Sequence, residues 1–178
     1  MEMPPELQIQ YLTPKKHFFT YISRSKEVSK RLDAERQFVL RFKEGNEMDQ
    51  RHAANFVCDF LRTEDIKGSE YTFMCVPAST PEKNLVRYKK FCATIAKRLG
   101  LSNGFGLVDV VSERCEVHAG GSRENINYML PCSLEGRKVV IFDDVETTGM
   151  TFASFAAELE RRGAEVVQGL FLAQAEPC

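Results

Sequence analysis

The sequence has 178 residues, the length of one globular domain, and 43% of them are hydrophobic, which is enough for a packed core. Its 24 lysines and arginines stand against 25 acidic residues, so the net charge recruits neither nucleic acid nor an anionic membrane surface. The sequence contains no apolar run of about 20 residues that would span a bilayer, and its start, MEMPPELQIQ, lacks the basic segment of a signal peptide. We therefore expect a cytoplasmic protein.

Six cysteines are scattered singly along the chain, at positions 58, 75, 92, 115, 132 and 178. None belongs to a CxxC pair, which argues against a zinc ribbon and against a disulfide framework. We interpret the cysteines as buried thiols.

The first 37 residues are rich in charge and carry aromatic residues without a clean period. We expect them to form an appendage packed on the main domain, because no Pro/Gly/Ser linker separates them from it. The stretch 25–42 stays ambiguous, since its apolar spacing suits a helix while the segment FVLRF suits a strand. The apolar positions from Ala53 to Leu61 then predict a helix.

From residue 71 onward, short apolar runs alternate with amphipathic stretches, a pattern typical of βαβ units on a parallel sheet. The predicted strands are 71–76, 107–111, 138–142 and 165–172. Helical spacing predicts helices over 85–99 and 152–159, which end at Gly100 and Gly163.

The segment VVIFDDVETTGMT, residues 139–151, carries the clearest chemistry of the chain. A buried strand would deliver Asp143 and Asp144 to the carboxyl edge of the sheet, where ligands of open α/β sheets bind. Adjacent carboxylates accept hydrogen bonds from the 2′- and 3′-hydroxyls of a ribose. The following turn can wrap a phosphate with backbone N–H groups at a helix N-terminus. It consists of Glu146, Thr147, Thr148, Gly149, Met150 and Thr151.

This segment resembles the hallmark of the type I phosphoribosyltransferases, which recognise 5-phosphoribosyl 1-diphosphate (PRPP). A weaker resemblance covers residues 38–174 and is closest to the competence-associated ComF-type branch. The resemblance implies one α/β domain with a mainly parallel five-stranded sheet flanked by helices, and a hood that contacts the acceptor. Residues 38–174 would be the core and 1–37 a hood candidate, with the acceptor region inside 2–67. Asp143 and Asp144 would reach Mg²⁺ through water.

Three other interpretations of the acidic pair do not match the residues around it. Haloacid-dehalogenase phosphatases need D-x-D-x-T, response regulators lack the TTG turn, and a Walker A loop needs a lysine where Met150 stands. The remaining alternative is a polar loop that simply caps a helix.

Two further elements follow from the family resemblance. Pro77, Ala78 and Ser79 would touch the diphosphate, although an ordinary helix cap at Thr80 explains this stretch equally well. Residues 112–127 would form a lid with hinges at Gly120 and Gly121. In that lid, Arg114 and Arg123 are candidate diphosphate clamps. His118 is a weaker candidate, for assisting the acceptor or the leaving group. Lys83 and Arg87 lie one and two turns inside the helix after the first loop, and a solvent-exposed role for them stays open.

The sequence leaves two classes of function open. The first is a Mg²⁺-dependent transferase that moves ribose 5-phosphate from PRPP to a nitrogen acceptor, a base or an amine, and releases diphosphate. The second is a PRPP-sensing regulator or partner-binding module without turnover. The acceptor stays open, because the loop and the lysine-free lid together match no acceptor-specific subgroup of the family. The zinc-binding cysteines of many ComF-type proteins are missing, which argues against transferring a competence role. The oligomeric state, including a homodimer, also stays open.

Overall fold

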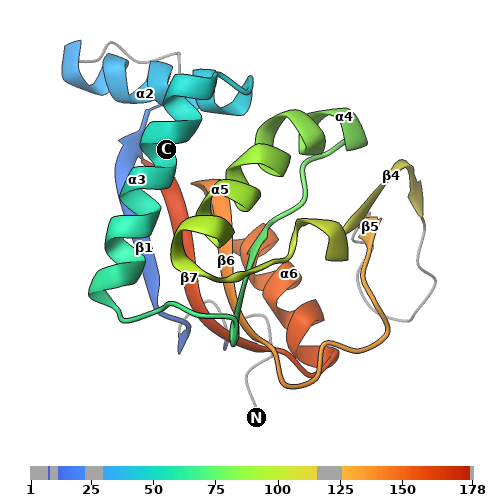
Figure 1. The fold of residues 1–178 in the computed structure, drawn as a ribbon. Coiled ribbons are helices and arrows are strands. Elements are labelled where there is room, and N and C mark those ends of the chain that lie inside the picture. Colours follow the sequence, from blue (N-terminus) through green and yellow to red (C-terminus); the bar gives the residue numbers. More distant parts are fainter. Residues whose placement is uncertain (1–7, 9–11, 23–29, 116–125, 177–178) are drawn as a thin grey trace.

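The computed structural model describes residues 8, 12–22, 30–115 and 126–176, with 112–115 and 126 described by their backbone alone. Within these residues a five-stranded sheet has the order β1-β7-β6-β2-β3, and every neighbouring pair is parallel (Figure 1). This confirms the predicted α/β class with a parallel sheet flanked by helices. The strands are β1 (Lys15–Tyr21), β2 (Tyr71–Cys75), β3 (Ser102–Asn103), β6 (Lys138–Glu146) and β7 (Glu165–Ala175).

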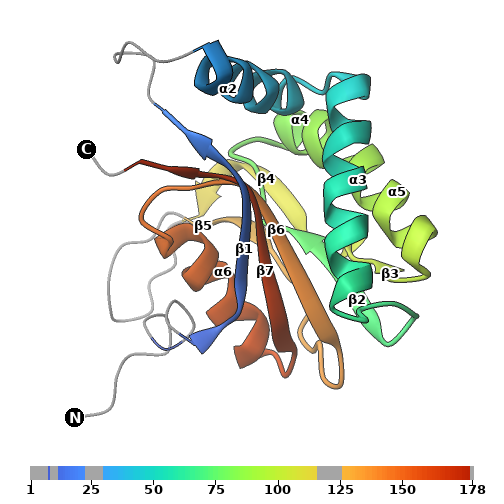
Figure 2. The same cartoon turned by 90° about the vertical axis from the view of Figure 1, so that its left-hand side faces the viewer.

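Helices cover both faces of the sheet. On one face lie α2 (Lys30–Lys43), α3 (Glu47–Thr63), α4 (Pro81–Asn84) and α5 (Lys90–Leu99), and on the other lies α6 (Met150–Arg161) (Figure 2). Each face has its own apolar cluster, and β6 contributes to both because successive side chains point to opposite faces. Phe142 of β6 meets Phe91 of α5 with ring centroids 4.6 Å apart on the first face. No helix in the described ranges is both long and apolar enough to cross a membrane.

The predicted helix over 85–99 is interrupted. Its first part is a π turn, Leu85–Lys89, between α4 and α5. Gly100 ends α5 with φ +69°, as its position in the sequence predicts. Asn46 is the N-cap of α3, and its side-chain oxygen accepts the N–H groups of Met48 and Asp49 at 3.1 Å each.

The N-terminal segment requires a correction. Residues assigned to the appendage include β1, which is the edge strand of the main sheet and pairs with β7. Its charged start suits an edge position, where one side of the strand stays unpaired. The ambiguous stretch resolves as the helix α2 rather than a strand.

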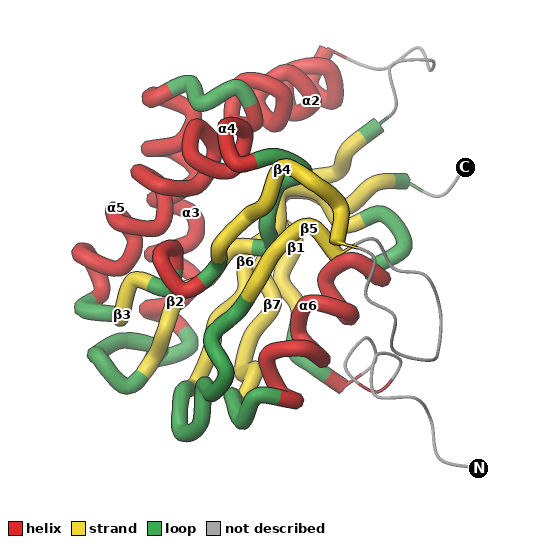
Figure 3. The backbone as a smooth tube through the Cα atoms, turned by 90° about the vertical axis from the view of Figure 1, so that its right-hand side faces the viewer, coloured by secondary structure: helices red, strands yellow, loops and turns green. Residues whose placement is uncertain are grey.

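The predicted strand 107–111 is also corrected. Residues 109–115 form β4 (Asp109–Cys115), which pairs antiparallel with β5 (Ile126–Met129) in a separate two-stranded sheet. The strand beside β2 in the main sheet is instead β3, which pairs with β2 through only two residue pairs. The sequence DVVSERC is too polar for a strand buried on both faces. The hairpin lies beside α4 (Figure 3).

The interpretation of the cysteines as buried thiols holds for Cys58, Cys75 and Cys92 but is wrong for Cys132, which is exposed. The sulfur atoms of Cys75 and Cys92 lie 3.2 Å apart in the core. Cys115 and Cys178 lie outside the residues whose side chains are described.

Candidate functional site

The acidic pair lies where β6 runs past the end of its neighbour. The strand β2 ends at Cys75, opposite Phe142, and the N–H of Val76 donates to the Phe142 carbonyl at 2.8 Å. From Asp143 on, β6 is paired only with β7 along this part of the described sheet. The acidic pair and the loop after β2 therefore share the carboxyl edge of the sheet, the edge at which ligands of parallel sheets bind.

Asp144 is buried at 6% exposure and holds two cations. The guanidinium of Arg87 donates to its carboxylate at 2.7 Å, and the ammonium of Lys43 lies 3.3 Å from the other oxygen. The Tyr88 hydroxyl donates to Asp144 at 3.4 Å. Sequence analysis missed Lys43 and left Arg87 open, because neither has a local signal that connects it with residue 144.

Asp143 is half-buried, and one of its oxygens accepts the N–H of Asp144 at 2.8 Å. Burial raises the pKa of the Asp143 carboxyl well above its usual range, and the charge of Asp144 raises it further. The Asp144 N–H, Lys43 and Arg87 act in the opposite direction. The two carboxyl groups thus differ in their surroundings, since Asp144 is paired with two cations, whereas burial favours the protonated form of Asp143.

Glu146, predicted to wrap a phosphate, lies at the end of β6 with its side chain turned toward β1. Its carboxylate contacts the Lys15 ammonium at 2.7 Å and the His17 Nε2 at 2.5 Å. Lys15 also lies over the Phe152 ring, 5.4 Å from its centroid. An ionised carboxylate only accepts hydrogen bonds, so any contact of Glu146 with a phosphate would have to come from its backbone N–H.

The rest of the predicted phosphate turn precedes α6. Gly149 occupies the N-cap position with φ +77° and has no side chain to cap the helix, and the Met150 N–H makes a long hydrogen bond of 3.4 Å to the Thr148 hydroxyl. Thr147, Thr148 and Thr151 are exposed, and Met150 is 40% exposed. Because the first N–H groups of a helix lack intrahelical partners, this end favours an anion.

A small cavity beside this turn is lined by Asp143, Glu146, Thr147, Gly149 and Thr151, among others, and has a volume of about 10 Å³. That is about the volume one water molecule needs. A phosphate therefore requires the turn to open or the ligand to approach from its exposed side.

The loop predicted to bind diphosphate is partly occupied by its own neighbours. The Ala78 N–H donates to the Asn84 side chain, and the Ala78 carbonyl accepts from Asn127, both at 3.0 Å. Ser79 is exposed, and its hydroxyl accepts from the Lys83 ammonium at 3.5 Å. Pro77 is partly exposed. Within this loop, the Ser79 hydroxyl is therefore more accessible to a ligand than the N–H and carbonyl groups of Ala78.

The alternative interpretation of this loop as a helix cap is confirmed. Thr80 is the N-cap of α4, and its side chain accepts the Lys83 N–H at 3.3 Å, with Pro81 at the first helical position. A cap and a ligand contact can coexist in one loop, so the cap leaves the role of Ser79 untested.

Most of the predicted lid lies outside the described residues, including His118, Gly120, Gly121 and Arg123. Arg114 belongs to β4, but its side chain is not described. The assignment of Arg114 and Arg123 as diphosphate clamps therefore stays a prediction.

The donor set fits Mg²⁺ only as a site completed by a ligand. Among the described residues, no group of three His, Cys, Asp or Glu side chains converges on one point. Mg²⁺ is commonly held by one or two carboxylates together with water and substrate phosphate oxygens. Asp143, with Asp144 beside it, matches that minimal requirement.

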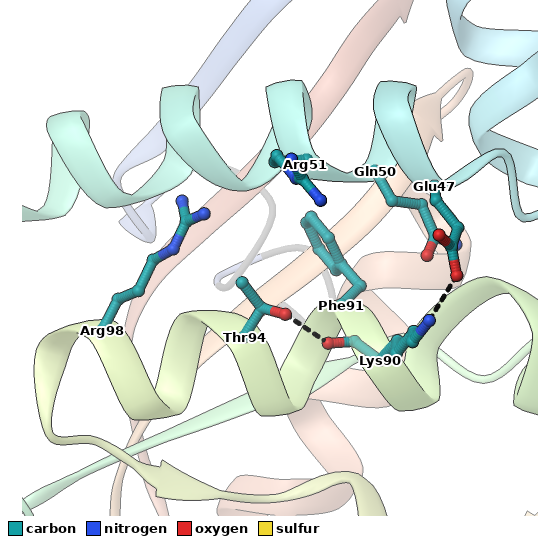
Figure 4. Close-up of a pocket in the computed structure, with 7 residues that line it drawn as sticks. All are labelled: Glu47, Gln50, Arg51, Lys90, Phe91, Thr94 and Arg98. Atoms are coloured by element: carbon teal, nitrogen blue, oxygen red, sulfur yellow. Dashed lines mark hydrogen bonds and ion pairs between the residues drawn. The ribbon is translucent and has the colours of Figure 1, made fainter.

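A separate cavity of about 460 Å³ lies between α3 and α5 (Figure 4). Its lining contains Arg51, Lys90 and Arg98, with Glu47 paired to Lys90, and includes neither carboxylate of the acidic pair. It is thus distinct from the sheet-edge site.

No protein-family model matches the sequence, and no curated protein matches it significantly.

Proposed function

We propose that this protein binds PRPP and acts as a Mg²⁺-dependent phosphoribosyltransferase that moves ribose 5-phosphate to a nitrogen acceptor and releases diphosphate. In this proposal the sheet and its helices are a type I phosphoribosyltransferase fold, closest to the ComF-type branch. The observation that carries it is that one continuous segment presents Asp143 and Asp144 at the carboxyl edge and then a helix N-terminus whose N-cap residue, Gly149, has no capping side chain.

The chemistry assigned to each group follows from its charge and position. Asp143 and Asp144 accept hydrogen bonds from the ribose hydroxyls, and the amides that begin α6 bind the 5-phosphate. The bond from C1 to the diphosphate loosens toward an oxocarbenium-like sugar, and the acceptor nitrogen adds at C1. Bound Mg²⁺, held by the acidic pair through water, would neutralise charge on the departing diphosphate. The protein's own contribution is positioning and electrostatic stabilisation.

A non-catalytic PRPP sensor or partner-binding module of the same fold is the second candidate. It is favoured by the Ala78 N–H, which already donates to Asn84 and is therefore not free for a departing diphosphate. Both candidates share the ribose 5-phosphate site and differ in turnover alone.

The test combines a binding assay with a turnover assay. Calorimetry with ribose 5-phosphate measures occupancy, and diphosphate release from PRPP and Mg²⁺ across a panel of bases and amines measures transfer. We expect the pair Asp143→Asn and Asp144→Asn to weaken binding at least about tenfold, since it removes charged acceptors. The matched control makes the same change at the exposed Asp59 and Asp65.

Each outcome has one meaning. Binding with diphosphate release supports the transferase, while binding without release for any acceptor supports the sensor. Absence of binding, or equal affinity in both double variants with the fold intact by circular dichroism, contradicts the proposal.

A further inference from the structure

The π turn before α5 is held by a buried side chain from another helix. The amide nitrogen of Gln50, on α3, donates to the Val86 carbonyl at 3.1 Å and to the Arg87 carbonyl at 2.9 Å. Gln50 is only 6% exposed, and Figure 4 shows it on α3, on the side that faces α5. Buried polar groups need partners, and π turns occur frequently at functional sites. The chain thus maintains a local departure from the regular helix.

The corner between α2 and α3 fits closely against this turn. Gly45 has φ +81°, and a Cβ atom there would lie 2.5 Å from the Val86 side chain and 3.1 Å from the Val86 carbonyl oxygen. The Arg87 Nε also donates weakly to the Lys43 carbonyl at 3.5 Å. Corner and turn together place Lys43 and Arg87 next to each other, although 44 residues separate them in the chain.

These two cations exceed what Asp144 requires. One buried carboxylate is neutralised by one cation, and Arg87 already makes the shorter contact, 2.7 Å against 3.3 Å for Lys43. The Lys43 side chain is 31% exposed and that of Arg87 18%. An ammonium has three donors and a guanidinium five, so both cations keep donors beyond those that Asp144 accepts. Spare donors of Lys43 and Arg87 therefore border the acidic pair.

We propose that Lys43 and Arg87 form an anion subsite that binds a diphosphate group beside the acidic pair, with Gln50 as the residue that positions Arg87. The identity of that group as the diphosphate of PRPP rests on the proposed function. Lys43 has the longer contact and the greater exposure, so it turns to the anion first, while Arg87 bridges Asp144 and the anion. A guanidinium can do both, because it carries five donors in a fixed fork.

The experiment measures binding of inorganic diphosphate and, separately, of ribose 5-phosphate, by calorimetry without and with Mg²⁺. Lys43→Met and Arg87→Met remove one charge each and keep the apolar stem. Lys89→Met is the control, since it removes the same charge from an exposed position of the same π turn. Lys43→Met keeps the Arg87 to Asp144 contact, so it stays informative if Arg87→Met fails to fold.

We expect Lys43→Met and Arg87→Met to weaken diphosphate binding at least about tenfold, the loss of one charge-assisted hydrogen bond, and Lys89→Met to change it by less than about twofold. Ribose 5-phosphate binding should be retained in Lys43→Met. Gln50→Met should weaken diphosphate more than ribose 5-phosphate, whereas a purely structural role would affect both equally.

Three results overturn the subsite while the proposed function stands. In the first, ribose 5-phosphate binds but diphosphate does not, and in the second, diphosphate binds equally well in Lys43→Met. An equal loss in Lys89→Met also overturns it, because the effect would then be general electrostatics. If neither ligand binds the unaltered protein, the subsite and the proposed function both fail.

Discussion

The cluster formed by Glu146 with Lys15 and His17 allows a quantitative prediction, because it joins the strand before the predicted phosphate turn to the edge strand β1. The Glu146 side chain is 8% exposed, and those of Lys15 and His17 are 15% and 24% exposed. We consider the substitution Glu146→Gln, which removes the charge and keeps the shape. The amide oxygen can accept from Lys15, and the amide nitrogen then faces His17, which accepts only when its Nε2 carries no proton.

The expected cost follows from the two contacts. A hydrogen bond to a charged group contributes about 1 kcal/mol more than a neutral one, so two weakened contacts give about 2 kcal/mol in the free energy of unfolding. Lys15→Met should cost less in the variant that already carries Glu146→Gln than it does alone, by about 1 kcal/mol, because the two residues interact directly. This comparison isolates the contact between Lys15 and Glu146.

The assay is urea unfolding at pH 7 for both single variants and the double variant. The control is Glu70→Gln, which makes the same change at an exposed position and should stay within about 0.5 kcal/mol of the unaltered protein. If Glu146→Gln also stays within that range, or if the two substitutions are strictly additive, the cluster does not hold β6 to β1.

Three further predictions concern the site and the sheet beside it. In the unaltered protein, stability should fall as pH rises from about 4 through the raised pKa of Asp143 in the folded state. Asp143→Asn should remove this fall, which urea unfolding between pH 4 and 8 would detect; an unchanged slope would contradict the raised pKa. Gly149→Val should destabilise the chain by about 1 kcal/mol or more and weaken ribose 5-phosphate binding, because φ is +77° there; full stability and affinity in calorimetry would refute this. Gly104→Ala should cost about 1–3 kcal/mol of stability in thermal unfolding, since the new Cβ would lie 2.8 Å from the Phe73 carbonyl oxygen. Gly106→Ala is the control, because a Cβ there would meet open space; equal losses of stability in the two variants would contradict the close packing at Gly104.

The sequence predicted the inner strands of the sheet well, because strands buried on both faces are near-continuous apolar runs. The expected strands 71–76, 138–142 and 165–172 correspond to β2, β6 and β7, with β6 extending four residues further, to Glu146. The edges were predicted less well. The strand β1 is polar, β3 has two residues, and neither carries a pattern that separates it from a loop.

The position of the candidate site was predictable, but the partners of its side chains were not. The segment 139–151 indicates the carboxyl edge because strand, acidic pair and turn are contiguous. Lys43 and Lys15 reach Asp144 and Glu146 across about a hundred residues or more of sequence, and only the folded sheet brings them together. The π turn likewise depends on Gln50 from another helix, so helical spacing alone predicts a regular helix.

The most direct test of the central claim is a crystal structure of the protein grown with ribose 5-phosphate. We predict the phosphate on the backbone amides of residues 147–151 and the sugar hydroxyls on Asp143 and Asp144. A ligand in the cavity between α3 and α5, with the turn before α6 empty, would contradict the assignment of this segment as the ribose 5-phosphate site.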